Sequence, residues 1–152
     1  MARRAEKIRN SMKCVFPAKS VNEGLARMMT AAFIAQTDPP ISVLAELKTA
    51  VSEAVTNCIV HGYRDKADKE HCPIYISAVF TEAGVLRIAI RDQGKGIPDI
   101  ALARTPLYTT DAENERSGMG FTVMESFTDR MRVSSKPGKG TTVVLEKKII
   151  RL

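Results

Sequence analysis

The sequence contains no tryptophan, and aromatic residues make up only 5% of its 152 residues. Proteins that bind nucleic acid usually present a continuous basic stripe, stacking aromatics or a base-reading motif, and none of these is visible here. Direct binding to nucleic acid is therefore not expected, although the net charge is +6. Several of the positive charges lie near the N-terminus, and we interpret residues 1–10 as a flexible basic tail.

Cysteines are also few: Cys14, Cys58 and Cys72, with no C-x-x-C pair. An odd number without paired spacing argues against a disulfide framework and is typical of a reducing compartment. Cys58 and Cys72 lie near His61 and His71 in the sequence, but these residues do not have the usual spacing of zinc ligands. We therefore expect buried or half-buried thiols.

Long hydrophobic runs are missing as well. The longest, such as residues 31–35, are far too short to span a bilayer, and the basic N-terminus is not followed by an apolar signal core. We therefore expect a soluble, cytoplasmic protein without a membrane partner. Hydrophobic residues make up 44% and charged residues 26% of the chain, which is typical of a globular protein. Residues 11–152 are expected to form a single domain.

The hydrophobic pattern predicts an α+β protein. The predicted elements are a strand at 12–17, helices at 21–36 and 42–61, strands at 73–81 and 84–91, a helix at 120–127, and strands at 130–135 and 141–148. Ser20 and Glu23 have the pattern of a capping box, and Gly62 is expected to cap the second helix. This order predicts a two-layer α/β sandwich, with helices on one face of a mixed, mainly antiparallel sheet.

Glu53 and Asn57 lie four positions apart in the helix predicted over 42–61. Because a helix has about 3.6 residues per turn, this spacing stacks the carboxylate and the amide on one face. Such a pair can hold a general base beside a metal ion. The same spacing is equally found among solvent-exposed polar pairs, so the pair alone does not establish a site.

Two glycine-rich segments follow. Asp92-x-Gly94-x-Gly96 comes directly after a predicted strand, where glycines permit positive φ and a close approach of backbone to ligand. The Gly-Met-Gly segment at 118–120 precedes a predicted helix, whose free N–H groups favour phosphate. Each segment alone also fits an ordinary turn or helix entry. Taken together with the Glu-x-x-x-Asn pair, they predict a nucleotide site.

Five segments carry a resemblance to a known family: ELKTAVSEAVTNCIVHGY (46–63), RDQGKGIPD (91–99), ARTPLYTT (103–110), ERSGMGF (115–121) and GKGTTVVL (138–145). In this order they resemble the nucleotide-site segments of the GHKL ATPase/kinase superfamily. Within it the chain is most similar to the anti-sigma F factors, serine kinases that control a sporulation sigma factor in endospore-forming bacteria. The resemblance runs from about residue 11 to the end. It implies a GHKL-type (Bergerat-type) ATP-binding fold.

The resemblance implies a role for each polar motif residue. Glu53 would be the general base that takes the proton from a substrate serine, and Asn57 would coordinate Mg²⁺ through its amide oxygen. Asp92 would accept a hydrogen bond from the adenine amino group, with Thr141 as its helper. His61 is one turn beyond Asn57, but we interpret it as a helix-end residue rather than a catalytic one.

Further contacts with the nucleotide are implied in the loops. The polar, turn-rich stretch between Pro98 and Gly120 is too long for an ordinary connection, and its segment 104–117 would act as a lid over the phosphates. The other residues that the resemblance assigns to the nucleotide are Gly94, Gly96, Ile97, Thr109, Thr110, Ser117, Gly118, Met119 and Gly120. The expected cofactors are ATP or ADP and Mg²⁺.

The resemblance also implies partners and a regulatory role. A homodimer in the ATP-loaded state would bind and inhibit the sigma factor. It would also phosphorylate a small antagonist, the anti-anti-sigma protein, on serine. Arg27 matches an arginine that the family uses to grip both proteins.

Other interpretations share parts of the pattern. A stress-response-type anti-sigma kinase is the nearest one. The ATP-binding domain of a histidine kinase would need a helical hairpin bearing a phosphoacceptor histidine, for which the chain offers no room. A non-catalytic module could sequester a sigma factor with nucleotide as a conformational ligand, but Glu53 argues against it because binding alone needs no base.

Overall fold

A computed structural model describes residues 5–106 and 119–150. The elements are β1 (Ile8–Pro17), α1 (Val21–Ala35), α2 (Ile41–Asn57), a π-helical turn (Cys58–Gly62), a 3₁₀ turn (Lys69–His71), β2 (Pro73–Thr81), β3 (Val85–Asp92), α3 (Ile100–Ala103), α4 (Gly120–Ser126), β4 (Arg130–Lys136) and β5 (Gly140–Lys148). The chain is therefore the predicted α+β protein, with each predicted strand and helix present within a few residues of its expected bounds.

The strands form one five-stranded sheet in the order β1-β2-β3-β5-β4. Every neighbouring pair is antiparallel, so the predicted mixed sheet is wrong. Two helices separate β1 from β2, and the second returns the chain to the end where β1 finished, which makes β2 run back along β1. β3 and β4 run in the same direction, but β5 lies between them and pairs antiparallel with both.

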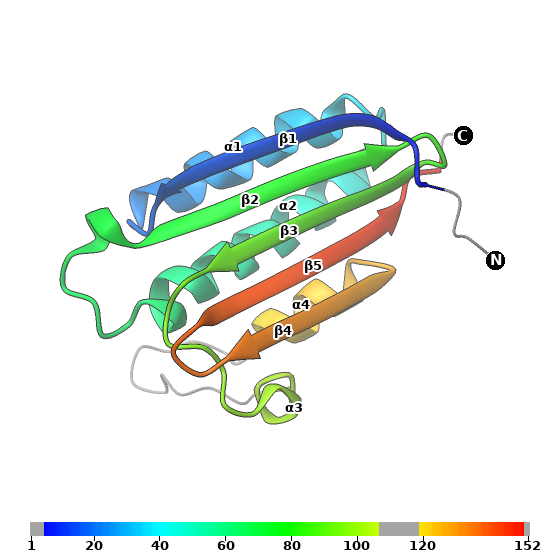
Figure 1. The fold of residues 1–152 in the computed structure, drawn as a ribbon. Helices are drawn as coiled ribbons and strands as arrows, with labels where there is room; N and C mark the ends of the chain where they lie inside the picture. Colours follow the sequence, from blue (N-terminus) through cyan, green and yellow to red (C-terminus); the bar gives the residue numbers. More distant parts are fainter. Residues whose placement is uncertain (1–4, 107–118, 151–152) are drawn as a thin grey trace.

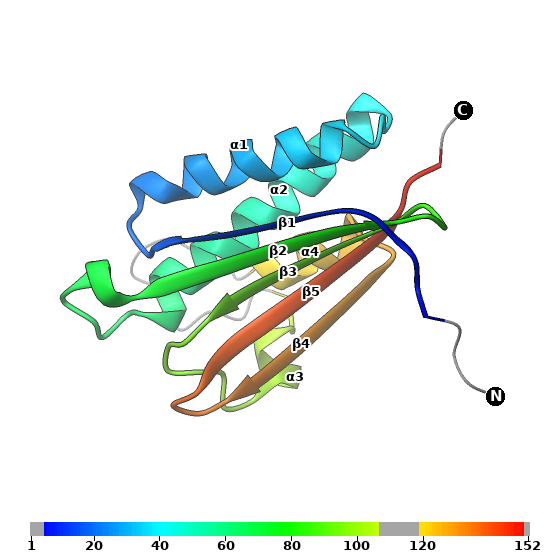
Figure 2. The same cartoon turned by 45° about the horizontal axis from the view of Figure 1, so that its top comes forward.

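Helices α1, α2 and α4 cover one face of the sheet, as predicted (Figures 1 and 2). Alternation in the strands explains this arrangement, because side chains on one face of each strand are apolar. In β2 the buried members are Ile74, Ile76, Ala78 and Phe80. Helix α2 supplies the opposing stripe of Leu47, Ala50, Val51, Ala54 and Val55. Burial of one such large aliphatic side chain contributes about 1.5–3 kcal/mol, and this layer forms the core.

The cysteines belong to this core, as the sequence predicted. Cys58 and Cys72 are buried, and Cys14 is half-buried. Burial raises the pKa of the Cys58 thiol well above its ordinary value, and it raises the pKa of Cys14 as well. None of the helices within the described residues is long and apolar enough to cross a membrane.

The first strand begins at Ile8, before the predicted start at residue 12. Residues 8–10, expected in the tail, therefore belong to the sheet. The pairing of Ile8 with Thr81 and the hydrogen bond from Glu82 N–H to the Lys7 carbonyl (2.9 Å) extend the strand in this direction. The polar composition of this segment gave no strand signal, because its side chains are exposed.

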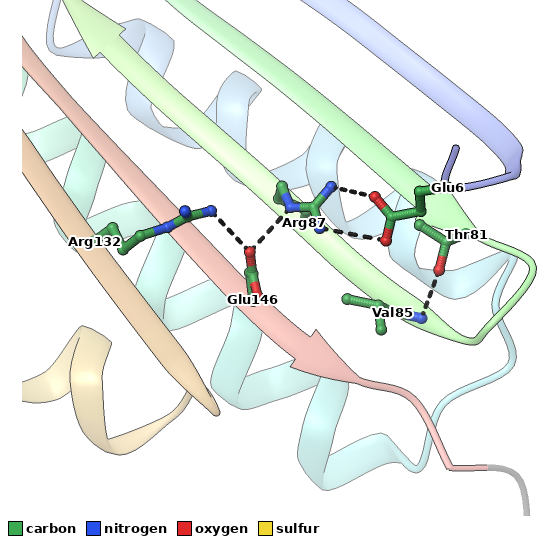
Figure 3. A network of polar contacts seen from close by, with 6 residues as sticks. All are labelled: Glu6, Thr81, Val85, Arg87, Arg132 and Glu146. Atoms are coloured by element: carbon green, nitrogen blue, oxygen red, sulfur yellow. Dashed lines mark hydrogen bonds and ion pairs between the residues drawn. The ribbon is translucent and has the colours of Figure 1, made fainter. Parts of the chain in front are cut away.

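A polar network crosses the open face of the sheet, away from the helices (Figure 3). Arg87 on β3 donates from Nη1 to Glu6 (2.9 Å) and from Nε to Glu146 on β5 (3.0 Å). Arg132 on β4 donates to the same Glu146 oxygen (3.0 Å). The hydrogen bond from Arg87 lowers the pKa of Glu6. The network thus fastens the segment before β1 onto the sheet.

The predicted capping box at the start of α1 is wrong. Ser20 already has helical backbone angles (φ −54°, ψ −34°) and makes no side-chain capping bond. The Glu23 carboxylate instead accepts a hydrogen bond from the Ser52 hydroxyl of α2, and it lies 3.7 Å from Arg27 Nη1. Tertiary contact between the two helices therefore replaces the local cap.

Candidate nucleotide site

The structure brings Glu53 and Asn57 together with the beginning of α4. Both side chains are half-buried on one face of α2. A Cβ placed on Gly120 would lie 3.3 Å from Glu53 Oε2, 3.4 Å from Asn57 Nδ2 and 3.5 Å from Asn57 Oδ1. A side chain at Gly120 would therefore be in van der Waals contact with Asn57 and slightly too close to Glu53. The predicted one-turn stacking thus leaves a carboxylate and an amide beside the first residue of α4.

Asp92 lies at the end of β3 and is only 4% exposed. Its Oδ1 atom accepts hydrogen bonds from the backbone N–H groups of Gly94 (2.9 Å) and Thr141 (3.3 Å), and the Cys58 thiol donates to the same carboxylate. Burial raises the pKa of Asp92 above its ordinary value, and these hydrogen bonds offset only part of that effect. A buried, acceptor-only carboxylate is suited to bind a donor such as an exocyclic amino group.

The two predicted glycines of the Asp92 loop act in different ways. Gly96 has φ +77°, the left-handed conformation that the sequence predicted. Gly94 is not in that conformation, but a Cβ there would overlap the backbone of Gly62. The Lys95 N–H donates to the Gly62 carbonyl (2.9 Å), which holds the loop against the end of α2.

Gly62 therefore does not act as the predicted helix cap. Beyond Asn57, helix α2 widens into the π-helical turn, in which the Tyr63 N–H donates to the Cys58 carbonyl (3.0 Å). A Cβ on Gly62 would lie 2.9 Å from Asp92 Cγ. The glycine is needed for close approach to the carboxylate rather than for its backbone angles.

Tyr63 is a site residue that the sequence analysis missed. Its hydroxyl donates to the Pro73 carbonyl (2.5 Å) and accepts from the Gln93 N–H (2.6 Å), so one side chain joins the end of α2, the start of β2 and the Asp92 loop. Burial raises the pKa of Tyr63 to about 12. The only signal in the sequence was the HGY run at 61–63, which is part of a segment that resembles the family but does not indicate where the Tyr63 hydroxyl would bind.

Ser135 on β4 was also missed. Its hydroxyl accepts from the Ile97 N–H (2.7 Å), donates to the Gly140 carbonyl (3.0 Å) and contacts the Thr141 hydroxyl (2.8 Å). The predicted residues Ile97 and Thr141 are thereby joined through a third residue. Only the β4–β5 register, in which Ser135 faces Thr141, brings it to the site.

Four of the predicted nucleotide residues, Thr109, Thr110, Ser117 and Gly118, lie outside the described residues, as does most of the predicted lid. Met119 is the residue before α4 and is half-buried. Arg104, where the predicted lid begins, forms an ion pair with Glu125 of α4 (3.2 Å). Arg27 lies on α1, with 44% of its side chain exposed and Glu23 as its ion-pair partner.

The chain matches the model of the histidine kinase-like ATPase domain over residues 16–147. Fold and site geometry together define a member of this nucleotide-binding class. The anti-sigma F factor of Geobacillus kaustophilus is 51% identical over 144 residues, covering 95% of this chain and 96% of that protein. The anti-sigma F factor of Thermoanaerobacter sp. (strain X514) is 51% identical over 140 residues, covering 92% of this chain and 94% of that protein. The chain belongs to the anti-sigma F factor family.

A solved structure shares nearly the whole fold of this chain. The structure of the RsbU and RsbW domains of a Mycobacterium tuberculosis protein has a TM-score of 0.70 to this chain at 20% identity. The match covers 94% of this chain and 33% of that one. The arrangement of helices on one face of an antiparallel sheet is therefore shared at low sequence identity.

Proposed function

We propose that the protein is an anti-sigma factor and an ATP-dependent protein kinase of serine specificity. The observation that carries this proposal is the placement of Glu53 and Asn57 directly against Gly120, at the same end of the sheet as the buried Asp92 carboxylate. One site can thus hold the nucleotide base of ATP at Asp92 and its phosphates near Gly120. Family membership supports the same function.

Asp92 is the proposed acceptor for the adenine amino group, with Thr141 beside it. The hydrogen bonds from the Gly94 and Thr141 N–H groups to Oδ1 hold the carboxylate in one orientation. A fixed acceptor discriminates between nucleotide bases, because a base that presents an acceptor instead of a donor at this position would face a buried carboxylate without forming a hydrogen bond to it.

Asn57 and the nucleotide phosphates are proposed to hold Mg²⁺, which would neutralise phosphate charge during transfer. The donor set fits this ion, since an amide oxygen is a hard, neutral ligand. Within residues 5–106 and 119–150, no three His, Cys, Asp or Glu side chains gather into a cage for a metal. Mg²⁺ commonly needs only one or two protein oxygens when phosphates supply the others.

Glu53 is proposed to accept the proton of the substrate serine. A general base must be a carboxylate within hydrogen-bond reach of the hydroxyl, and Glu53 is half-buried one turn before Asn57 and next to Gly120. Binding of a nucleotide would not need this carboxylate. Its position therefore favours transfer of the phosphoryl group over binding alone.

The proposed partners follow the family. A homodimer in the cytoplasm would bind a sporulation sigma factor when loaded with ATP, and it would phosphorylate the anti-anti-sigma antagonist. Arg27 is the proposed contact for both proteins. Its side chain is 44% exposed, and its ion pair with Glu23 is long (3.7 Å), so the guanidinium can bind a partner.

The kinase assignment is tested with Glu53→Gln, which keeps the size of the side chain but removes the base. Labelled ATP and a candidate antagonist are incubated with each variant, and ADP binding is measured by calorimetry. We expect loss of serine labelling with ADP affinity retained. Glu46→Gln, two turns earlier on α2, is the matched control and should label the antagonist at the wild-type rate. Labelling by Glu53→Gln at the wild-type rate would exclude Glu53 as the base.

The partner assignment is tested with Arg27→Glu. Reversal of this charge should weaken binding of the sigma factor while ADP affinity stays unchanged, since Arg27 is on α1 and is not one of the proposed nucleotide residues. Lys13→Glu, which reverses an exposed charge on β1, is the control. Unchanged sigma binding in Arg27→Glu would remove the assignment. A wild-type protein that binds ATP and sigma factor but labels no serine would instead be the non-catalytic module.

A further inference from the structure

Three polar side chains form a row across the helix-facing side of the sheet, at the end of the strands. Asp92 follows the buried residues Ile88 and Ile90 on β3, and Thr141 precedes Val143 and Leu145 on β5. Because side chains alternate between faces, both belong to the face that packs on the helices.

Ser135 completes the row from the next strand. The pairing of Ser135 with Thr141 places the two hydroxyl groups 2.8 Å apart. On the other side, the Thr141 N–H donates to Asp92 Oδ1 (3.3 Å). Ser135 therefore lies one residue further from Asp92 than Thr141, and its connection to Asp92 runs through Thr141.

The hydrogen bonds of Ser135 determine the direction of the bond with Thr141. The Ile97 N–H can only donate to the Ser135 oxygen, and the Gly140 carbonyl can only accept the Ser135 hydrogen. A hydroxyl has one hydrogen, so the hydrogen between the two hydroxyl groups must come from Thr141. With that hydrogen used, the Thr141 oxygen presents only lone pairs.

We propose that Ser135 is a specificity-determining residue for the nucleotide base, which acts by keeping the Thr141 hydroxyl an acceptor. This inference rests on the proposed binding of ATP. Asp92 and Thr141 would then both accept hydrogen, which suits the 6-amino group of adenine. A 6-oxo purine, such as hypoxanthine or guanine, would place a third acceptor against two acceptors and would be rejected.

Removal of the Ser135 hydroxyl changes this balance. In Ser135→Ala the Thr141 hydrogen has lost its partner, and the hydroxyl can rotate to donate to a 6-oxo group. The preference for ADP over inosine diphosphate should therefore fall by about tenfold, the value of roughly one hydrogen bond. A merely structural loss at the Ile97 loop would weaken both nucleotides by the same factor and leave their ratio unchanged.

The experiment measures the dissociation constants of ADP and inosine diphosphate by calorimetry in the presence of Mg²⁺. The variants are Ser135→Ala, Thr141→Val and the double substitution. If Ser135 acts through Thr141, Ser135→Ala lowers the ADP preference in the wild-type background and has no effect on it in Thr141→Val. Ser135→Thr, which keeps a hydroxyl on the same carbon, should retain the wild-type preference.

Ser134→Ala is the matched control, because Ser134 is exposed and its alternate position points it to the other face. An unchanged preference in Ser135→Ala, or a change that persists in the Thr141→Val background, overturns the inference. If Ser135→Ala is too unstable to titrate, Ser135→Cys replaces it and should show a reduced preference; a wild-type preference there overturns the inference as well. Failure of the wild-type protein to bind ADP at all would instead refute the proposed function and this inference with it.

Discussion

The backbones of Gly62 and Gly94 are in contact, so close that a Cβ on Gly94 would lie 1.9 Å from the Gly62 carbonyl oxygen. This contact joins the end of helix α2 to the loop that follows β3. It also sets the position of Asp92, because the Gly94 N–H donates to its carboxylate (2.9 Å). The geometry of the proposed site for the nucleotide base thus depends on two residues with no side chain.

Gly94→Ala should destabilise the protein by about 1–3 kcal/mol, the usual effect of inserting a methyl group into filled space. ADP affinity should fall as well, because the loop must move away from Gly62 and takes Asp92 with it. Urea unfolding and calorimetry measure the two effects. Gly24→Ala is the control: nothing lies within 4 Å of its Cβ position, and because Gly24 is the fourth residue of α1, alanine should stabilise the protein by up to about 0.5–1 kcal/mol.

Asp92→Asn should abolish ATP binding but stabilise the free protein at neutral pH. Burial raises the pKa of Asp92, so the folded state binds its proton more tightly than the unfolded state does. The ionised carboxylate therefore destabilises the fold above its folded pKa, and this penalty disappears as pH falls below the unfolded value. An asparagine oxygen can still accept from Gly94 and Thr141.

The measurement is the melting temperature of both proteins from neutral to acidic pH. The melting temperature of Asp92→Asn should exceed that of the wild type most at neutral pH, and this difference should decrease as the pH is lowered. Asp38→Asn is the control, because Asp38 is exposed and its positive φ (54°) is also tolerated by asparagine. An Asp92→Asn protein less stable than the wild type at neutral pH would contradict the prediction.

Tyr63→Phe should lower both stability and ADP affinity. It leaves the Gln93 N–H and the Pro73 carbonyl without their hydroxyl partner, at a cost of about 1–3 kcal/mol. Tyr75→Phe is the matched control, since its ring remains under the Arg91 guanidinium (4.2 Å) and little change is expected. Equal stability of the two variants in urea would show that the Tyr63 hydroxyl contributes nothing.

Tyr63 also predicts a loss of stability in alkali. Its pKa is raised from 10.0 to about 12 by burial, so the folded state resists ionisation. The stabilisation is complete below the unfolded pKa and is lost as pH rises through the folded pKa. The wild-type protein should therefore lose more stability than Tyr63→Phe between these two values. Parallel curves for the two proteins would contradict this.

Arg87→Met should lower the melting temperature more than Arg132→Met. Arg87 binds both Glu6 and Glu146, whereas Arg132 binds only Glu146, which keeps Arg87 when Arg132 is removed (Figure 3). Because exposed ion pairs are screened by salt, the difference should shrink at high ionic strength. Thermal melts at low and high salt measure it, and a larger effect of Arg132→Met would be the opposite result.

The elements of the fold could be predicted from the sequence because their signals are local. Alternation marks β2 and β3, helical spacing marks α1 and α2, and a glycine-rich turn joins β4 to β5. The same holds for the Glu53 and Asn57 pair, whose stacking follows from helix geometry alone. Asp92 could be placed at the end of a strand for the same reason.

What the sequence could not determine depends on contacts between distant segments. The all-antiparallel order places β5 between β3 and β4, and the long-range pairing of β5 with β3 brings Thr141 to Asp92. The π-helical turn carries Gly62 onto Asp92, a contact that no local pattern predicts. The sequence by itself predicted a set of residues for the chemistry and determined their local placement on helix and strand ends. Only the tertiary structure decided their partners, because burial and hydrogen bonding arise where separate elements meet.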